Sequence, residues 1–195
     1  RISHAKEAIK LLLHDADQGE MLANTLEQLN RKRQNMTEEL MEIADALALK
    51  QLNEPILIIT DKSFHGGLIG LLAGKLAEKY SRPTIVMEER EKVFIGSCRS
   101  IPNVNVVEVL NTVKDLLSHY GGHAAAAGFD LPKENLKDFT RRVIAHVGKT
   151  ISAKSIKPIL EIECEINHDE ISAKTIEVLE WFEPFGCANP TPRFI

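Results

Sequence analysis

The chain has 195 residues, 44% of them hydrophobic and 27% charged, with a formal net charge of −4 at pH 7. These values are ordinary for a globular protein with a full core, and no apolar run approaches the roughly 20 residues that cross a bilayer, which excludes a membrane-spanning helix. The three cysteines, Cys98, Cys164 and Cys187, are odd in number and far apart. This argues against a disulfide framework or a paired-cysteine zinc site and favours the reducing cytoplasm.

Charge is distributed unevenly along the chain. Residues 55–150 carry 13 Lys and Arg against 10 Asp and Glu, whereas the segments on both sides are net acidic. A modestly basic middle segment favours a polyanionic partner, but it lacks the strong basic stripe of a dedicated duplex binder. We therefore expect any nucleic-acid contact to be local.

The N-terminal part predicts two helices, a short one over residues 3–13 and a long one over residues 19–50. In the long segment, apolar side chains recur at alternating spacings of four and three, which is a heptad pattern. Its members are Leu22, Leu26, Leu29, Met36, Leu40, Ile43 and Leu47, and Arg33 is the one polar residue among them. Two interpretations remain open, a coiled-coil dimer and a strut that crosses between two domains.

Residues 53–150 predict an α/β domain built on a mixed sheet. The continuous apolar run Ile56–Thr60 is typical of a strand buried on both faces. In chain order we expect strand 56–60, helix 68–80, strands 84–87 and 92–100, a helix from about Val106 to His119, a strand over the small residues that follow, and helix 132–147. The two central strands are close enough in sequence to form a hairpin.

The C-terminal part predicts the start of another domain. A linker-like stretch, Ile151–Ser155, leads to an expected strand, Ile159–Ile166, in which glutamates alternate outward. A helix over 173–182 and a proline-rich corner, Glu183–Phe194, follow. The chain begins at Arg1 and stops at Ile195, where a strand is expected to begin, so we expect it to be a piece of a longer protein.

Three segments combine glycine with residues that suit a phosphate, and each lies where an element is expected to end. Glycine lets a ligand approach backbone amides, a helix N-terminus favours anions, and arginine offers a planar fork of donors. The candidate phosphate-binding residues are His65, Gly66, Gly67, Ser97, Arg99, Ser100, Gly121, Gly122, His123 and Gly128. If these ends share a rim, they form one site. The alternative is plain packing, with Gly121 capping a helix that ends at Tyr120.

Gly121–Phe129 closely resembles the Gly-Gly-His-Ala-x-Ala-Ala-Gly signature of the DHH-associated domain of DHH-superfamily phosphoesterases. Three further segments resemble the RecJ family of single-strand-specific 5′→3′ DNA exonucleases within that superfamily. They are Arg1–Leu13, like the end of the catalytic domain; Gly19–Lys50, like the helix that joins the two core domains; and Pro184–Phe194, like the beginning of the oligonucleotide-binding fold. Phe64–Gly70 and Gly96–Ser100 fit the same family in the same order.

The resemblance implies a division of the chain and a function. It implies the end of a catalytic domain at 1–18, a connecting helix at 19–52, a DHH-associated domain at 53–150 and the start of an oligonucleotide-binding domain at 151–195. It also implies that Arg99 and His123 contact phosphates of single-stranded DNA near the scissile bond, with His65 assisting. The implied setting is DNA repair and recombination in the cytoplasm, with single-strand-binding protein as a further partner of the intact protein.

The Asp-His-His motif that holds the family's Mn²⁺ or Mg²⁺ ions is absent. The only His-Asp pairs, His14-Asp15 and His168-Asp169, are isolated in different segments. We therefore expect the chain to bind no metal and to be inactive as a nuclease by itself, because paired ions activate the water in this family. The alternatives are a fragment of an oligoribonuclease or cyclic-dinucleotide phosphodiesterase of the same superfamily and a non-enzymatic coiled-coil dimer.

Overall fold

The computed structural model describes residues 2–13, 16–151 and 160–195. The chain divides into two compact units, residues 1–157 and 158–195. The described residues include no helix long and apolar enough to cross a membrane. His14 and Asp15, and the expected linker beyond Ile151, lie outside the described residues.

Two helices open the first unit. Helix α1 spans Lys6–Leu13 and packs against α2, which runs unbroken over Ala16–Leu49. The C-terminal third of α2 joins a core cluster through Leu40, Ala44 and Ala48. Part of the predicted heptad stripe is thus buried within the chain itself, and Leu40 is unavailable to a second copy. This packing favours the strut over the coiled-coil dimer.

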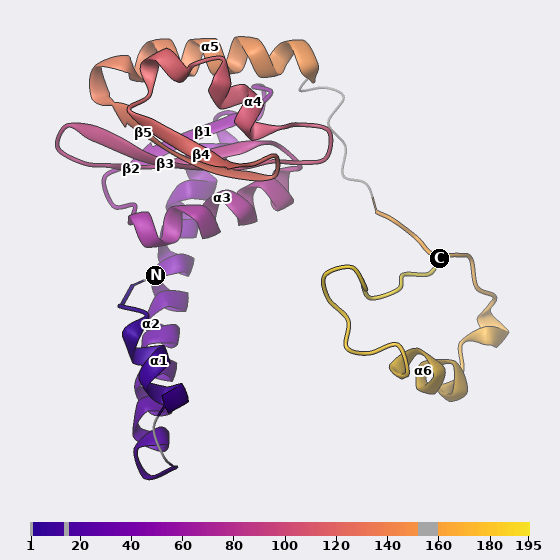
Figure 1. Ribbon diagram of the computed structural model, residues 1–195. Helices are drawn as coiled ribbons and strands as arrows, with labels where there is room; N and C mark the ends of the chain where they lie inside the picture. Colours follow the sequence, from indigo (N-terminus) through magenta and orange to yellow (C-terminus); the bar gives the residue numbers. More distant parts are fainter. Residues whose placement is uncertain (1, 14–15, 152–159) are drawn as a thin grey trace. The chain divides into compact units, whose positions relative to one another are not determined.

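A five-stranded mixed sheet forms the centre of the first unit (Figure 1). Its strands are β1 (Leu57–Asp61), β2 (Thr84–Glu89), β3 (Val93–Arg99), β4 (His119–His123) and β5 (Ala126–Pro132), in the spatial order β1-β2-β3-β5-β4. Strands β1 and β2 are parallel and joined by helix α3 (Gly66–Tyr80), whereas all other pairs are antiparallel. The predicted α/β class with a mixed sheet is confirmed.

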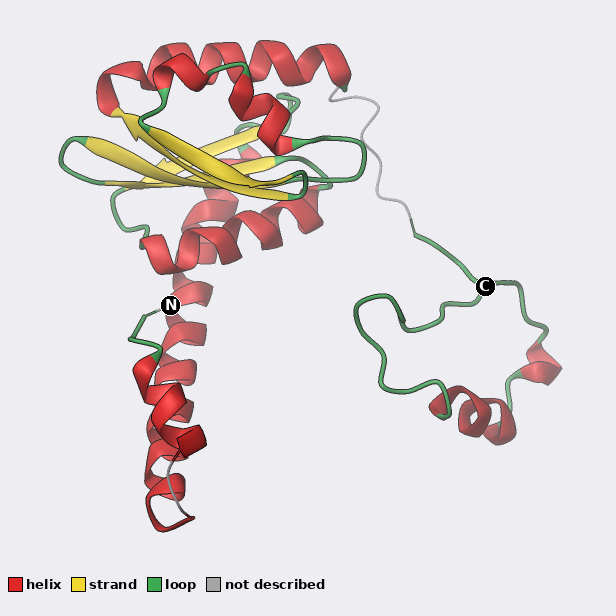
Figure 2. Cartoon of the chain, in the orientation of Figure 1, coloured by secondary structure: helices red, strands yellow, loops and turns green. Residues whose placement is uncertain are grey.

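Helices cover the two faces of the sheet differently, as Figure 2 shows. Helix α3 and the end of α2 pack on one face, which buries a cluster centred on Leu57, Ile59, Leu68 and Leu72. Helices α4 (Val106–Asn111) and α5 (Leu136–Thr150) pack on the other face. The short 3₁₀ helices η1 (Lys114–Leu116) and η2 (Lys133–Asn135) connect these elements to the strands.

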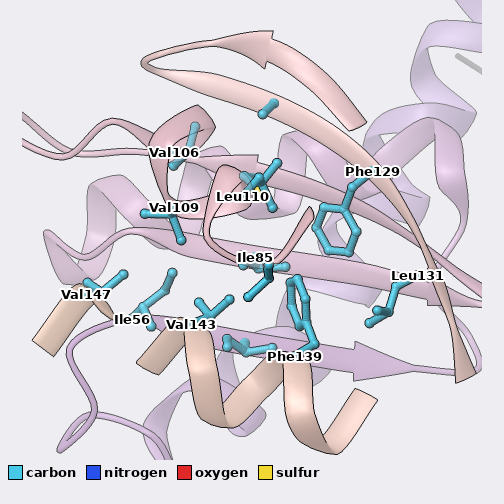
Figure 3. Close-up of a cluster of buried hydrophobic side chains, with 14 of the residues drawn as sticks. Ile56, Ile85, Val106, Val109, Leu110, Phe129, Leu131, Phe139, Val143 and Val147 are labelled. Atoms are coloured by element: carbon cyan, nitrogen blue, oxygen red, sulfur yellow. The ribbon is translucent and has the colours of Figure 1, made fainter. Parts of the chain in front are cut away.

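The larger cluster lies under α5 (Figure 3). Phe139 of α5 faces Phe129 of β5 with ring centroids 5.0 Å apart and a tilt of 33° between the rings. Both side chains are almost fully buried. Aromatic pairs in such tilted contact contribute about 0.5–1.5 kcal/mol beyond the burial of their area. This contact fixes β5, and with it the small residues of the candidate site, against the helical layer.

The expected helix from Val106 to His119 is wrong in its second half. Helix α4 ends at Asn111, and His119–His123 form strand β4. At Val113 the backbone leaves the helical region, with φ near −123°, and the side chain is fully buried in the core. Core burial and the ladder with β5 thus override the helical spacing of the apolar residues. Tyr120 therefore belongs to a strand, and the proposed helix cap at Gly121 does not exist.

The second unit contains little regular structure. Its helices are η3 (His168–Glu170) and α6 (Ala173–Glu180). Over its described residues, the expected strand 159–166 is reduced to one bridge, from Cys164 to Phe194, with three backbone hydrogen bonds between residues 163–166 and 193–195. Ile159 lies outside the described residues. A strand needs a partner along several residues, and here the pairing covers only the ends of two short segments.

Candidate nucleic-acid interface

The sheet register brings the two predicted phosphate-binding motifs onto one face. Directly paired residues of neighbouring strands share a face, so Ser97, Gly128 and Gly121 form one row across β3, β5 and β4. Arg99, Ala126 and His123 form the next row. We call these six residues the shelf. With strands about 4.8 Å apart, Arg99 and His123 lie about 10 Å from each other between Cα atoms.

The floor of the shelf is low because glycine and alanine occupy it. A methyl group at Gly121 would meet nothing within 4 Å, and one at Gly128 would meet only the Gly96 carbonyl oxygen at 3.6 Å. The glycines are therefore not required by contacts on this face. Their effect is to leave open space above the sheet between Arg99 and His123, where a ligand can approach the backbone closely.

Arg99 is held by neutral groups. Its Nη1 donates to the Cys98 carbonyl oxygen at 2.8 Å and to Ser97 Oγ at 3.2 Å. Among the ion pairs of the described residues, Arg99 has no carboxylate partner, unlike Arg90, which pairs with Glu88, and Arg142, which pairs with Asp115. The Arg99 guanidinium is thus oriented without being neutralised, and it keeps donors and charge for an anion.

His123 ends β4 with its side chain exposed, just before a two-residue turn. The turn is tied to the neighbouring loop, since the Ser100 amide donates to the Ala125 carbonyl oxygen at 2.9 Å and the Val106 amide donates to that of Ala124 at 3.0 Å. These bonds join the end of β3 to the end of β4. The backbone therefore fixes the position of Arg99 relative to His123.

Two predicted residues have clear roles in the backbone of this region. Gly122 has φ near +150°, and a methyl group there would lie 2.4 Å from the Ala126 carbonyl oxygen, so the hairpin itself requires glycine. The Ser100 hydroxyl donates to the carbonyl oxygens of Ile101 and Val104. That hydroxyl stabilises the loop after β3, and its hydrogen is already used.

The His65 segment lies at the N-terminus of α3. His65 Nδ1 accepts a hydrogen bond from the Gly67 amide at 3.1 Å, so this amide is already bonded. A methyl group at Gly66 would lie 2.8 Å from Glu88 Oε2, which places a carboxylate beside the first turn of the helix. A guanidinium nitrogen of Arg90, which pairs with Glu88, would lie 3.4 Å from the same methyl group, so an ion pair lies beside the amino end of α3.

The three motifs do not share one rim of the sheet, and helix α3 connects the His65 segment to the region of Arg99. His65 follows β1, whose last residue pairs with Glu88, whereas Arg99 pairs with Thr84 at the other end of β2. The Arg99 side chain, however, contacts Ser97 and lies beside Gly70 of α3. Gly70 is five residues from His65, about 7.5 Å along the helix. Helix α3 thus forms a wall of the shelf.

Sequence reasoning missed two residues on the same face. His119 and Asp130 are paired in the row beyond the glycines, with His119 Nδ1 and Asp130 Oδ2 3.6 Å apart. The signal was the two-residue alternation His119, Gly121, His123, which becomes visible only once this segment is assigned as a strand.

Metal ligands do not gather among the described residues. These include no group of three or more His, Cys, Asp or Glu side chains that could hold an ion. Cys98 is buried, and burial raises the pKa of its thiol to about 12, whereas Cys164 and Cys187 are exposed. His168 and Asp169 lie in η3 of the second unit. The described residues therefore do not fit the metal ions expected for the family.

A family model described as the DHHA1 domain matches residues 53–149. The whole chain is 31% identical to 25% of a single-stranded-DNA-specific exonuclease RecJ from Bacillus subtilis (strain 168). It is 28% identical to 28% of the RecJ of Thermus thermophilus. The chain thus spans about a quarter of the length of these curated relatives.

Solved structures agree with the sequence matches. The crystal structure of RecJ from Thermus thermophilus in complex with Mn²⁺ matches 96% of this chain and 28% of that chain, with a TM-score of 0.84 and 27% identity. A crystal structure of exonuclease RecJ bound to manganese matches 77% of this chain and 38% of that chain, with a TM-score of 0.68 and 29% identity.

Proposed function

We propose that this chain, which belongs to the RecJ family and is built around a DHHA1 domain, holds single-stranded DNA for an exonuclease. A backbone phosphate would lie above Gly121 and Gly128, between Arg99 and His123. Arg99 would supply charge and a planar fork of donors, and His123 would supply an N–H donor from the opposite side.

The observation that supports this proposal most is the state of Arg99. An arginine that is already paired with a carboxylate gains little from a phosphate, since it must first give up that pair. Arg99 is positioned by a hydroxyl and a carbonyl oxygen, and the sheet beside it carries only glycine and alanine in the shelf. Such a group is ready to accept an anion with little reorganisation.

We assign a secondary role to the start of α3. Because His65 Nδ1 accepts from the Gly67 amide, the neutral ring carries its proton on Nε2 and can donate it to a phosphate. Gly66 and Gly67 would keep this approach free of side chains. The Glu88 carboxylate beside Gly66 is paired with Arg90, so neither charge is free there, and we place the main contact at Arg99 and the weaker one here.

We assign bond cleavage to a catalytic domain outside this chain. Two RecJ structures are complexes with Mg²⁺ or Mn²⁺, and paired ions of this kind activate water and stabilise the leaving oxygen. We propose that residues 1–18 are the end of that domain, 19–52 the connecting helix, 53–150 the DHHA1 domain and 151–195 the start of an oligonucleotide-binding domain. The intact protein would act in DNA repair and recombination in the cytoplasm, with single-strand-binding protein as a partner.

The first test is binding of a fluorescent single-stranded oligonucleotide to the purified chain by anisotropy. A charged hydrogen bond to phosphate contributes about 1.5–3 kcal/mol, so we expect Arg99→Ala to weaken binding about 10- to 100-fold. The salt dependence of log K should also flatten by roughly one phosphate contact. The matched control is Arg141→Ala, which removes a surface arginine of α5 that is paired with Asp138. Equal affinities for both variants and the original chain would contradict the proposal.

The second test concerns chemistry. In the full-length enzyme, His123→Ala should lower kcat more than it weakens binding, because a donor to the scissile phosphate acts mainly as charge develops. The purified chain alone should release no nucleotides from single-stranded DNA with Mn²⁺. Release that survives removal of contaminating nucleases would contradict this part. Preferred binding of an oligoribonucleotide or a cyclic dinucleotide would instead favour another branch of the superfamily.

A further inference from the structure

Helix α3 presents three glycines four residues apart, Gly66, Gly70 and Gly74, and they differ in what surrounds them. A methyl group at Gly74 would meet nothing within 4 Å. At Gly70 it would lie 3.0 Å from Arg99 Nη2 and 3.2 Å from Ser97 Oγ. Of these three positions, only Gly70 lies beside the Arg99 guanidinium.

Close packing of the helix on the sheet does not explain glycine at this position. The three atoms nearest to a methyl group at Gly70 all belong to the side chains of Ser97 and Arg99, and none is a backbone or core atom. Helix α3 is instead anchored by the fully buried side chains of Leu68, Leu72 and Leu76. The space left by the missing side chain is occupied by the charged group itself.

We propose that Gly70 is a positioning residue for Arg99, a role that rests on the proposed phosphate contact of that arginine. Without a Cβ atom at Gly70, α3 leaves room for Nη2 of the guanidinium, while Ser97 and Cys98 accept hydrogen bonds from Nη1. The Arg99 guanidinium is thereby held beside Ser97, at the edge of the shelf. A methyl group would displace the guanidinium, because a long side chain moves more easily than a buried helix.

The test compares two equivalent substitutions in one helix, Gly70→Ala and Gly74→Ala. Alanine favours a helix over glycine, so neither variant should lower the melting temperature. We expect Gly70→Ala to weaken binding of a single-stranded oligonucleotide about three- to tenfold, part of the loss caused by Arg99→Ala. Gly74→Ala should bind like the original chain. Equal affinity of the two variants would overturn the proposal.

A double-mutant cycle separates positioning from a general disturbance. In the Arg99→Ala background, adding Gly70→Ala should cause no further loss of affinity, and the salt dependence should remain that of Arg99→Ala alone. A further loss of similar size would show that the methyl group acts through the fold, which would overturn the proposal. If Arg99→Ala itself has no effect, the proposed function fails. If it weakens binding and Gly70→Ala does not, only the positioning role fails.

Discussion

If alanine replaced glycine at three positions of the sheet, its methyl group would have different surroundings at each of them. At Gly96 it would lie 2.2 Å from the Phe129 ring, inside the core under α5. At Gly122 it would lie 2.4 Å from a backbone oxygen, on a residue whose φ is near +150°. At Gly121 it would meet nothing within 4 Å. The fold therefore requires the first two glycines, whereas the third keeps the shelf open.

These differences predict a separation of stability from binding. We expect Gly96→Ala and Gly122→Ala each to lower the free energy of unfolding by about 1–3 kcal/mol, through overpacking and backbone strain respectively. Gly121→Ala should change the free energy of unfolding little. It should weaken DNA binding, because its methyl group would occupy the open space above the shelf. Urea denaturation and anisotropy titrations measure the two effects. A strongly destabilised Gly121→Ala would show that this glycine serves the fold.

Most residues of the candidate site belong to local sequence patterns, but their arrangement could not be predicted. Gly121-Gly122-His123 and Ser97–Ser100 are local patterns that carry their chemistry with them. That Arg99 and His123 face each other depends on the register of β3, β5 and β4, which is set by contacts between distant residues. Gly70 illustrates the same limit, because the side chain that it contacts belongs to Arg99, 29 residues away in the sequence.

Among the elements, α2 and α3 are linked by a surface network. Asp45 of α2 accepts hydrogen bonds from Lys79 Nζ and from the Tyr80 hydroxyl of α3, each at 2.7 Å. The hydrogen bond from Lys79, followed by that from Tyr80, lowers the pKa of Asp45. The network joins the two helices beside the apolar contacts of Leu40, so it helps to hold the long helix on the domain.

The lowered pKa predicts how this link depends on pH. A carboxylate whose pKa is lower in the folded state stabilises the fold fully above its unfolded value of about 3.9, and this effect is lost as the pH falls through the folded value. We expect Asp45→Asn to destabilise the chain at pH 7 by about 0.2–1 kcal/mol, because the group lies at the surface. The difference from the original chain should disappear toward pH 2.

The control for this prediction is Glu42→Gln, on an exposed position of the same helix. Urea titrations at pH 7, 5 and 3 would follow both variants. If the loss of unfolding free energy caused by Asp45→Asn grew as the pH falls, the predicted pH dependence would be contradicted.

Elements with strong apolar patterns were predicted within a few residues, and exposed ones were not. Strand β1 and helix α3 have continuous or periodic buried residues. Every residue of β4 is exposed, so alternation between core and solvent gives no signal there. Its two glycines also have low intrinsic strand preference. The ladder with β5 is what makes this segment a strand.

For the whole molecule, the buried core lies entirely in the first unit. The residues of both buried clusters fall between Leu40 and Val147, and the described residues 160–195 include no buried side chain. A segment of about 40 residues without a core rarely folds without a disulfide, a metal or a partner. The second unit therefore adds little to the stability of the first.

This distribution predicts the result of truncation. We expect a chain cut after Ile151 to unfold in urea with the midpoint and slope of the full chain, since the slope scales with the surface exposed on unfolding. A peptide of residues 158–195 should show no cooperative transition by circular dichroism. A clear loss of stability on truncation would mean that the two units share a folding core.

The shelf extends from the interior of the sheet to its edge. Strand β3 is bonded on both sides, by β2 and β5, whereas β4 is bonded only by β5. Amides around Arg99 should exchange with solvent only through sub-global opening, whereas those around His123 should exchange through local fraying. A bound strand of DNA would slow exchange in β4 far more than in β3. A strand of DNA held on the shelf as proposed would therefore order the His123 end more than the Arg99 end.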